Sequence, residues 1–124
     1  MAATITFELS TLPPSTNALW RVAAGGHGYK SARYAAWCEA AGWELAAQKP
    51  GRIEGNYAIA LRFVAPDRRP RDLDNLCKPV SDLLVSAGAI ESDHLARKIT
   101  LEWAAEGPAV WGQITATKRG CNEA

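Results

Sequence analysis

The segment at residues 57–63 constrains the fold more than any other. Large apolar side chains alternate there with small or charged ones, as Tyr57, Ile59, Leu61 and Phe63 against Ala58, Ala60 and Arg62. A period of two residues predicts a strand with one buried face, and Ala65-Pro66 ends it. Residues 4–9, 98–103 and 110–117 alternate similarly. The last two runs are joined across Glu106-Gly107-Pro108, which predicts an antiparallel hairpin.

Two helices are predicted between these strands. Ser31 can cap a helix at residues 33–48, whose apolar face consists of Tyr34, Trp37, Ala41 and Leu45. A second helix ends at Gly88 and carries a stripe made of Leu76, Val80, Leu83, Leu84 and Ala87. The resulting order, β-α-β-α-β-β, predicts an α+β fold: a single small domain with a mixed sheet and two helices.

The length and composition fit one domain. The chain has 124 residues, of which 48% are apolar, so we expect one domain over residues 1–124, with an ordered core at about 4–118 and a frayed tail at 120–124. Glycines cluster around His27, which predicts a mobile loop at residues 15–31 that carries Arg21 and Lys30. The five tryptophans are mainly candidates for the core or an interface.

Cysteine usage and hydropathy predict a cytoplasmic protein. Cys38, Cys77 and Cys121 include no C-x-x-C pair, so we expect reduced thiols and no zinc knuckle. The first residues have neither the basic segment nor the apolar run of a signal peptide, and no run of about eighteen apolar residues occurs. We therefore expect no membrane partner.

Charge is distributed unevenly, although the net charge is only +1. That balance does not by itself indicate a nucleic-acid partner. Between residues 62 and 78, however, cations surround three acids: Arg62, Arg68, Arg69, Arg71 and Lys78 around Asp67, Asp72 and Asp74. The arginines at 68, 69 and 71 either bind phosphate groups or form an ordinary solvated loop, and the charge pattern alone favours neither.

Asp72 and Asp74 lie two residues apart where a predicted strand leads into a helix. Because Leu73 between them can point inward, both carboxylates can converge on one side and hold a divalent cation. At a separation of about 4–5 Å they repel by about 3–4 kcal/mol at an effective dielectric of about 20, which a cation would relieve. Oxygen-only donors favour Mg²⁺ or Mn²⁺. The simpler and commoner alternative is that one aspartate caps the helix.

Lys78 and Asp93 are further candidates for this site. Lys78 follows Asp74 by four residues, so on one helix face its ammonium can contact a carboxylate or a phosphoryl oxygen, or form an ordinary ion pair. Asp93 follows the second helix. A helix of about sixteen residues is about 24 Å long, so spacing alone does not bring Asp93 to Asp72.

Four stretches carry a resemblance to a known family. They are Leu12-Pro13-Pro14-Ser15-Thr16-Asn17 with Trp20-Arg21, Pro66-Asp67-Arg68-Arg69-Pro70-Arg71-Asp72-Leu73-Asp74-Asn75, Leu76-Cys77-Lys78 with Asp82 and Leu83, and Ala87-Gly88-Ala89-Ile90 leading to Asp93. Over about residues 4–118 the chain resembles the RusA-like Holliday junction resolvases, small endodeoxyribonucleases common in prophages. The D-x-D-N-x-x-K core followed by A-G and an acid is more specific than its parts. Where the family often has two consecutive acids, this chain has Ser92-Asp93 after Glu91.

The resemblance implies a Mg²⁺-dependent nuclease, with Mn²⁺ as a possible substitute, that acts as a homodimer on four-way DNA junctions in recombination and repair. It implies that Asp72, Asp74 and Asp93 bind the metal, that Lys78 is catalytic, and that Arg71 helps to bind DNA. Paired symmetric nicks would follow from the two-fold symmetry of such a junction. Other candidates for phosphate contacts are Arg21, Lys30, Arg33, Arg68, Arg69, Lys118 and Arg119.

Two alternatives remain open. The first is a catalytically inactive module that binds junctions or other nucleic acids and whose carboxylates only cap the helix. The second is a metal-dependent phosphohydrolase that acts on small nucleotides. The lack of a glycine loop that cradles phosphate before a helix argues against the second alternative.

Overall fold

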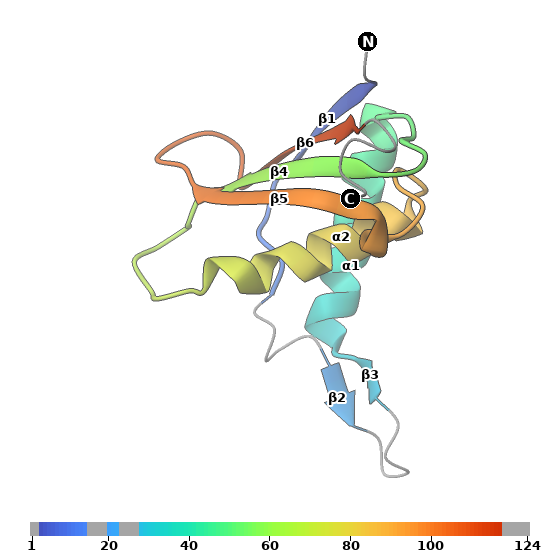
Figure 1. Ribbon diagram of the computed structural model, residues 1–124. Helices are drawn as coiled ribbons and strands as arrows, with labels where there is room; N and C mark the ends of the chain where they lie inside the picture. Colours follow the sequence, from blue (N-terminus) through green and yellow to red (C-terminus); the bar gives the residue numbers. More distant parts are fainter. Residues whose placement is uncertain (1–2, 15–19, 23–27, 118–124) are drawn as a thin grey trace.

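The computed structural model describes residues 3–14, 20–22 and 28–117 (Figure 1). Its strands are β1 (Thr4–Leu9), β2 (Trp20–Val22), β3 (Gly28–Lys30), β4 (Tyr57–Phe63), β5 (Ala96–Trp103) and β6 (Val110–Ala116). Its helices are α1 (Ala32–Gln48) and α2 (Cys77–Ser86), with the short 3-10 helices η2 (Leu73–Leu76) and η3 (Asp93–Leu95). The predicted tail at 120–124, which includes Cys121, lies outside the described residues. So do His27, Lys118 and Arg119.

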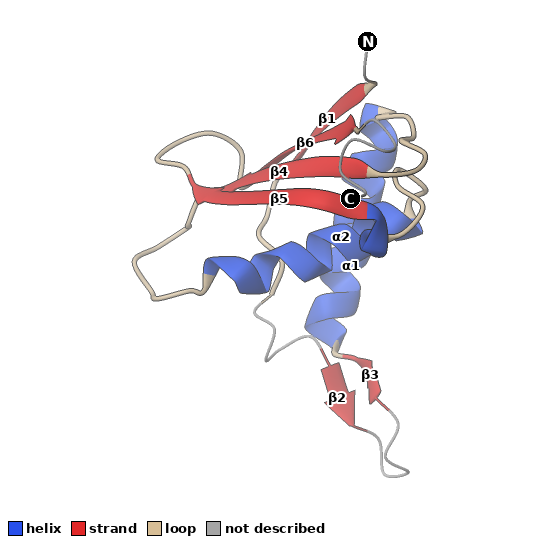
Figure 2. Ribbon diagram, viewed as in Figure 1, coloured by secondary structure: helices blue, strands red, loops and turns tan. Residues whose placement is uncertain are grey.

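β4 lies inside a four-stranded mixed sheet with the order β1-β6-β4-β5. β5 runs parallel to β4, while β6 runs antiparallel to both β4 and β1. α1 and α2 lie on one face of this sheet, and α2 with its flanking 3-10 helices connects β4 to β5 (Figures 1 and 2). The predicted α+β fold, with a mixed sheet and two helices, is confirmed.

The predicted hairpin between residues 98–103 and 110–117 is wrong, because β4 separates β5 from β6. The connection through α2 places β5 parallel to β4, since parallel neighbours require a crossover. β6 then pairs with the other side of β4. Residues 104–109 cross the end of β4, where Ala104 N–H donates to Phe63 O and Val64 N–H donates to Ala109 O.

The loop predicted at residues 15–31 contains a short antiparallel pair instead. β2 pairs with β3, and Trp20 lies opposite Lys30. The pair projects beyond the start of α1, away from the four-stranded sheet (Figure 1). Residues 15–19 and 23–27 are outside the described part of the chain, so the loop prediction is wrong only for the two strands.

The core lies between the helices and the sheet. α1 begins where Ser31 Oγ accepts the Tyr34 N–H at 3.1 Å, and its buried residues are the four predicted: Tyr34, Trp37, Ala41 and Leu45. β4 buries Tyr57, Ile59, Leu61 and Phe63. The predicted stripe of the second helix is buried at Leu76, Val80, Leu83 and Leu84. Ala87 is exposed, against the prediction, because α2 ends there and Gly88 turns the chain at φ +79°.

Two further properties concern the described part of the chain. Cys38 and Cys77 are free thiols. Within residues 3–14, 20–22 and 28–117, no helix is both long enough and apolar enough to cross a membrane.

Candidate active site

Lys78 joins the two ends of the connection through α2. Its Nζ lies 2.9 Å from Asp82 Oδ1, one turn further along α2, and it forms a second ion pair with Asp93 Oδ2. Asp93 is the first residue of η3 and lies 15 residues beyond Lys78 in the sequence. The chain therefore brings Asp93 back to the first turn of α2, which spacing alone did not predict.

The ion pair favours the charged form of both of its members. Hydrogen bonds to Asp93 and Asp82 raise the pKa of Lys78 above its ordinary value, although desolvation opposes this. The hydrogen bond from Lys78 lowers the pKa of Asp93. Tyr57 of β4 is buried nearby, and burial and the charge of Asp93 raise its pKa. The sequence indicated Tyr57 only as a core residue, and no pattern in it signals this nearness to Asp93.

Asp72 and Asp74 are exposed at the start of this connection. Asp72 directly precedes η2, and its side chain makes no capping hydrogen bond to the helix backbone. Among the described residues, its Oδ2 accepts a single, long hydrogen bond of 3.4 Å, from Asn75 Nδ2. No side chain caps α2 either, because its N-cap residue is Leu76. Asp72 thus takes the N-cap position of η2 and Asp74 its first turn, but the hydrogen bond expected of a capping aspartate is absent. Leu73 packs against the core, as its predicted inward orientation requires.

Lys78 does not pair with Asp74, although the two residues are four apart. Asp74 belongs to η2, and the α-helical turn begins only at Cys77. A 3-10 helix has three residues per turn, so positions 74 and 78 do not share one α-helical face. The expected contact is therefore absent, and Asp82 takes that place. Sequence reasoning missed this role of Asp82, although its i,i+4 spacing after Lys78 was a usable signal.

Glu91 and Ser92, at the variable acidic position, are both engaged in local structure. Glu91 Oε1 accepts the Gly55 N–H at 2.5 Å. Ser92 is the N-cap of η3, where its Oγ accepts the His94 N–H at 3.4 Å. Asp93 is therefore the acid of this segment that faces Lys78.

Asp67 organises the arginine loop between β4 and η2. Arg71 forks onto it, with Nη1 2.8 Å from Oδ1 and Nη2 3.1 Å from Oδ2. Arg69 adds its backbone N–H at 2.9 Å and its Nε at 3.3 Å. These contacts lower the pKa of Asp67 far below its ordinary value and raise the pKa of Arg71. Arg68 is exposed and makes no ion pair with any residue that the structure describes.

A hollow of about 450 Å³ lies beside this loop. Arg33, Arg69 and Arg71 line it together with Pro13 and Pro14. The proline segment at 12–14 and the arginine loop are two of the stretches that carry the family resemblance. They are far apart in the sequence and meet here, so three of the predicted phosphate-binding arginines line one depression.

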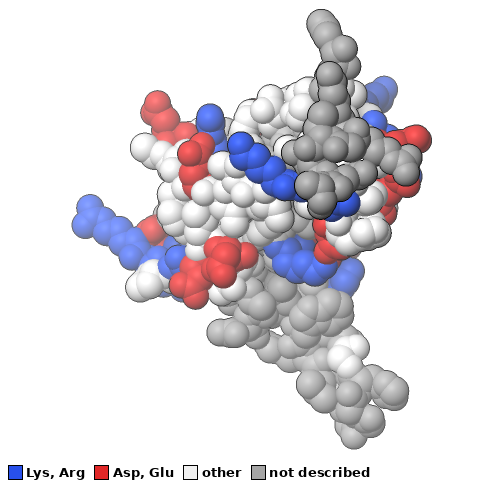
Figure 3. All heavy atoms as spheres, in the orientation of Figure 1, with Lys and Arg blue, Asp and Glu red and all other residues white. Residues whose placement is uncertain are grey.

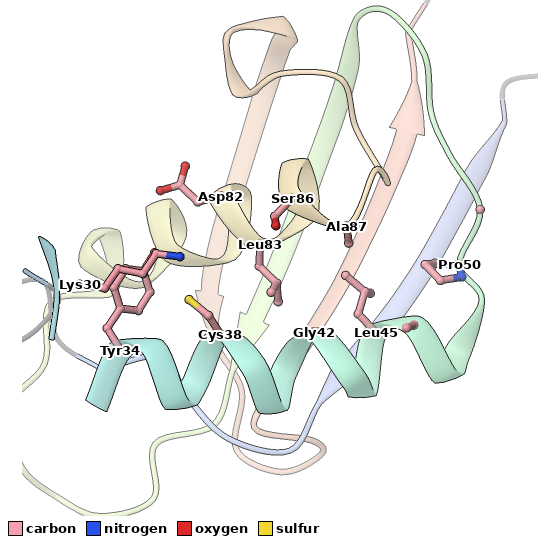
Figure 4. Close-up of a pocket in the computed structure, with 12 residues that line it drawn as sticks. Lys30, Tyr34, Cys38, Gly42, Leu45, Pro50, Asp82, Leu83, Ser86 and Ala87 are labelled. Carbon is pink, nitrogen blue, oxygen red and sulfur yellow. The ribbon is translucent and has the colours of Figure 1, made fainter. Parts of the chain in front are cut away.

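A second hollow, of about 520 Å³, lies between α1 and α2 (Figure 4). Asp82 and Lys30 both line it, so it adjoins the Lys78 site through Asp82. Lys30 Nζ lies 5.5 Å from the ring centroid of Tyr34. Burial, together with the charges of Cys38 and Asp82, raises the pKa of Tyr34 to about 12. Lys30 is thus placed over an aromatic ring, whereas the side chain of Arg21 is outside the described set.

Charge of neither sign dominates the face shown in Figure 3. Acidic and basic side chains occupy adjoining patches on it, and basic side chains project at the left, where Figure 1 has the loop between β4 and α2. This mixture agrees with the net charge of +1.

The three predicted metal ligands are not gathered into one cluster. Among the described residues, no three Asp, Glu, His or Cys side chains lie close enough together to hold a metal ion. Asp93 is paired with Lys78, while Asp72 and Asp74 are exposed and form no ion pair within the described ranges. Their chemistry nevertheless suits a hard divalent cation, because all three are carboxylates.

Comparisons with known proteins agree on one family. A family model described as Endodeoxyribonuclease RusA matches residues 11–115. Crossover junction endodeoxyribonuclease RusA of Aquifex aeolicus (strain VF5) is 37% identical over 93 residues, which cover 73% of this chain and 73% of that protein. These matches place the chain in the class of endodeoxyribonucleases. Within that class, it belongs to the RusA family.

Proposed function

We propose that this chain is a divalent-metal-dependent endodeoxyribonuclease that resolves four-way DNA junctions by paired symmetric nicks. The ion pair between Lys78 and Asp93 carries the proposal, because it holds the third acid at the start of α2. Asp72 and Asp74 lie in the segment directly before this helix. The junction as substrate is carried over from the crossover junction activity in the name of the Aquifex aeolicus relative.

Asp72, Asp74 and Asp93 would hold Mg²⁺ or Mn²⁺. When bound, such a cation supplies positive charge that stabilises a phosphodiester during cleavage. The absence of a capping hydrogen bond from Asp72 supports this role, because no helix N–H occupies its carboxylate. The hydrogen bond from Lys78 lowers the pKa of Asp93, which favours the ionised state that a cation requires.

Lys78 itself would act on the substrate. Its side chain is 64% exposed, so its ammonium can reach a phosphoryl oxygen while it remains near Asp93 and Asp82. A fixed positive charge at that point stabilises negative charge that develops on the phosphoryl group. We therefore propose Lys78 as a catalytic residue.

The basic residues around the site would position the DNA. Arg68 and Arg69 are exposed in the loop before Asp72, and Arg71 orders this loop through Asp67. We propose that all three contribute to phosphate binding, with Arg21 and Lys30 on the β2–β3 pair as further contacts. Such contacts fix the orientation of the DNA without reading its sequence.

The symmetry of the substrate favours a homodimer. A four-way junction has approximate two-fold symmetry, so two copies of the chain can present one site to each of two opposed strands. We propose that the chain acts in this form, as one domain per copy, in the cytoplasm where DNA junctions arise.

The test is cleavage of a synthetic mobile four-way junction, with a linear duplex of the same sequence as the control substrate. The wild-type chain should produce paired symmetric nicks in Mg²⁺ or Mn²⁺. Asp74→Asn should retain folding and junction binding but lose cleavage, because it keeps the side-chain volume and removes the charge. Glu106→Gln, at an exposed position in the segment after β5, is the matched control and should cut normally.

Two outcomes would contradict the proposal. Wild-type protein that binds junctions but never cuts them in Mg²⁺ or Mn²⁺ would be a binding module. Turnover of mononucleotides together with little salt-sensitive affinity for junctions would indicate a phosphohydrolase.

A further inference from the structure

The two edges of the four-stranded sheet differ in how their backbone is covered. At the β1 edge, the Gln48 side chain of α1 behaves like part of a neighbouring strand: its Oε1 accepts the Glu8 N–H at 2.8 Å, and its Nε2 donates to Glu8 O at 2.6 Å. Glu44 accepts the Ser10 N–H at 3.2 Å. β5, at the other edge, pairs only with β4 among the described strands.

The open side of β5 is defined by one hydrogen bond. Ala104 N–H donates to Phe63 O at 2.8 Å, so the backbone groups of Ala104 point toward β4. Because backbone direction alternates along a strand, Thr100 and Glu102 also point toward β4, whereas Ile99 and Leu101 point their N–H and C=O groups outward. Ile99, Leu101 and Trp103 can therefore bond another strand, whereas Arg97 lies at a register shift and is outside this alternation.

Apolar side chains accompany these outward backbone groups. Ile99, Leu101 and Trp103 lie opposite the buried β4 residues Ile59, Leu61 and Phe63, on the helix-covered side of the sheet. The helices cover them incompletely, because Ile99 is 52% exposed and Trp103 is 41% exposed. An eight-residue edge strand with exposed apolar residues and no proline is a template for pairing with another strand.

The sequence of β5 is complementary to itself when it is reversed about Thr100. An antiparallel copy in this register places Lys98 opposite Glu102 and Ile99 opposite Leu101. Ile99 and Leu101 then form a hydrogen-bonded pair, as their outward backbone groups require. Lys98 and Glu102 form non-hydrogen-bonded pairs, in which side chains lie closest and opposite charges attract.

Other two-fold registers lose this match. A centre at Lys98 or at Glu102 places two like charges directly opposite each other, which is unfavourable. A centre at Ile99 or at Leu101 places a charged residue opposite Thr100 instead of its counter-charge. Glu102 is already bonded through Oε1 to Arg62 Nε at 2.5 Å, and its second oxygen can accept from Lys98 of another copy.

From these observations we infer that β5 is the surface through which two copies of this chain associate. The two β5 strands run antiparallel about a two-fold axis at Thr100 and join both sheets into one continuous sheet. This inference deepens the proposed function and rests on it for its purpose, since the two-fold axis relates the two sites that a junction needs. The pairing itself requires no catalysis.

The first test measures mass against concentration by analytical ultracentrifugation. Wild-type protein should dimerise. Lys98→Glu and Glu102→Lys should each raise the dissociation constant about tenfold or more, because each creates two like-charge pairs. The combined charge exchange Lys98→Glu with Glu102→Lys should restore much of the association. Glu8→Lys, on the covered β1 edge, should leave it unchanged.

The second test is a disulfide at the axis. Thr100 lies opposite itself in a non-hydrogen-bonded pair, where Cα atoms are about 4.5 Å apart, within the range that a disulfide spans. With Cys38, Cys77 and Cys121 replaced by serine, Thr100→Cys should form a covalent dimer on mild oxidation, whereas Thr6→Cys on β1 should not. A monomeric wild type, or a dimer that neither charge variant weakens and Thr100→Cys does not trap, would overturn the inference. Both tests measure association alone, so a negative result would overturn this inference and leave the proposed nuclease activity to the cleavage assay.

Discussion

Two charged clusters flank η2, and they differ in what balances their acids. In the arginine loop, Asp67 receives Arg71 in a two-bond fork and Arg69 through both backbone and side chain. At the helix start, Asp72 and Asp74 have no ion pair among the described residues, and Lys78 turns to Asp82 and Asp93. The chain thus neutralises the loop acid internally and leaves Asp72 and Asp74 without a counter-charge from any described residue, as a site for an external cation requires.

Replacing an aspartate by asparagine should affect junction cleavage very differently in the two clusters. Asp72→Asn should lower the rate of junction cleavage by about 10³-fold or more, because it removes a proposed ligand of the divalent cation. The charge of such a cation stabilises the transition state by several kcal/mol. At saturating protein, Asp67→Asn should cut within about threefold of wild type, because Asp67 supports the loop proposed to bind DNA and not the acids proposed to hold the cation. Single-turnover cleavage assays give both rates. Equal losses in the two variants would show that the clusters do not differ in function.

Lys78, in the cluster at the start of α2, should have the next largest effect on cleavage. Lys78→Met should lower the cleavage rate by about 10²-fold, which is typical for the loss of one group that stabilises transition-state charge. Thermal unfolding should change little, because the Lys78 side chain is 64% exposed. A variant that keeps full activity would remove Lys78 from the chemistry, and one that fails to fold would give it a structural role.

The arginine loop should affect binding more than cleavage. Arg68→Ala combined with Arg69→Ala should reduce the slope of log affinity against log salt by about one unit for each lost phosphate contact. Arg52→Ala is the control, because Arg52 bonds Gly88 O at 3.0 Å, away from the loop. Fluorescence anisotropy with junction DNA at several salt concentrations measures the slope. An unchanged slope in the loop variant would exclude these arginines from the DNA path.

The smallest effect concerns the pH dependence of stability. Because folding lowers the pKa of Asp93, the ion pair stabilises the folded state fully above the pKa of unfolded aspartate, about 3.9. This stabilisation is lost as the pH falls through the pKa of Asp93 in the folded state. Because folding raises the pKa of Lys78, its stabilisation of the folded state is complete below the pKa of unfolded lysine, about 10.4, and is lost at higher pH. The difference in unfolding free energy between wild type and Lys78→Met should therefore be largest at about pH 5–9, shrink below about pH 4, and stay below about 1 kcal/mol because both groups are exposed. Urea unfolding at pH 3 and pH 7 measures it, and an increase toward pH 3 would contradict it.

Local periodicity predicted the elements of the fold but not all of their pairing. The faces of α1 and β4 follow directly from spacings of 3.6 and 2 residues, so their buried residues were predicted correctly. The hairpin of β5 and β6 was wrong, because pairing depends on the crossover through α2 and not on the alternation of either strand. The strands β2 and β3 were missed, since each is only three residues long.

The candidate site was predicted in part for a similar reason. Asp72 and Asp74 stand out in the sequence because they lie two residues apart where a predicted strand leads into a helix. The contact between Lys78 and Asp93 depends on how η3 returns along α2. The family resemblance implied that Asp93 joins Asp72 and Asp74, but it did not specify this contact. The i,i+4 spacing of Asp82 after Lys78 was a usable signal, whereas the nearness of Tyr57 to Asp93 required the tertiary structure.

Binding of Mn²⁺ tests the central claim most directly, because it reads the acids without cleavage or DNA. Titration followed by electron paramagnetic resonance should show saturable binding to the wild-type chain. Asp72→Asn, Asp74→Asn and Asp93→Asn should each weaken the affinity by about tenfold or more, as is typical when a group that supports a metal site is lost, and Glu106→Gln should leave it unchanged. Equal affinity in all of these proteins would contradict a metal site at the start of α2.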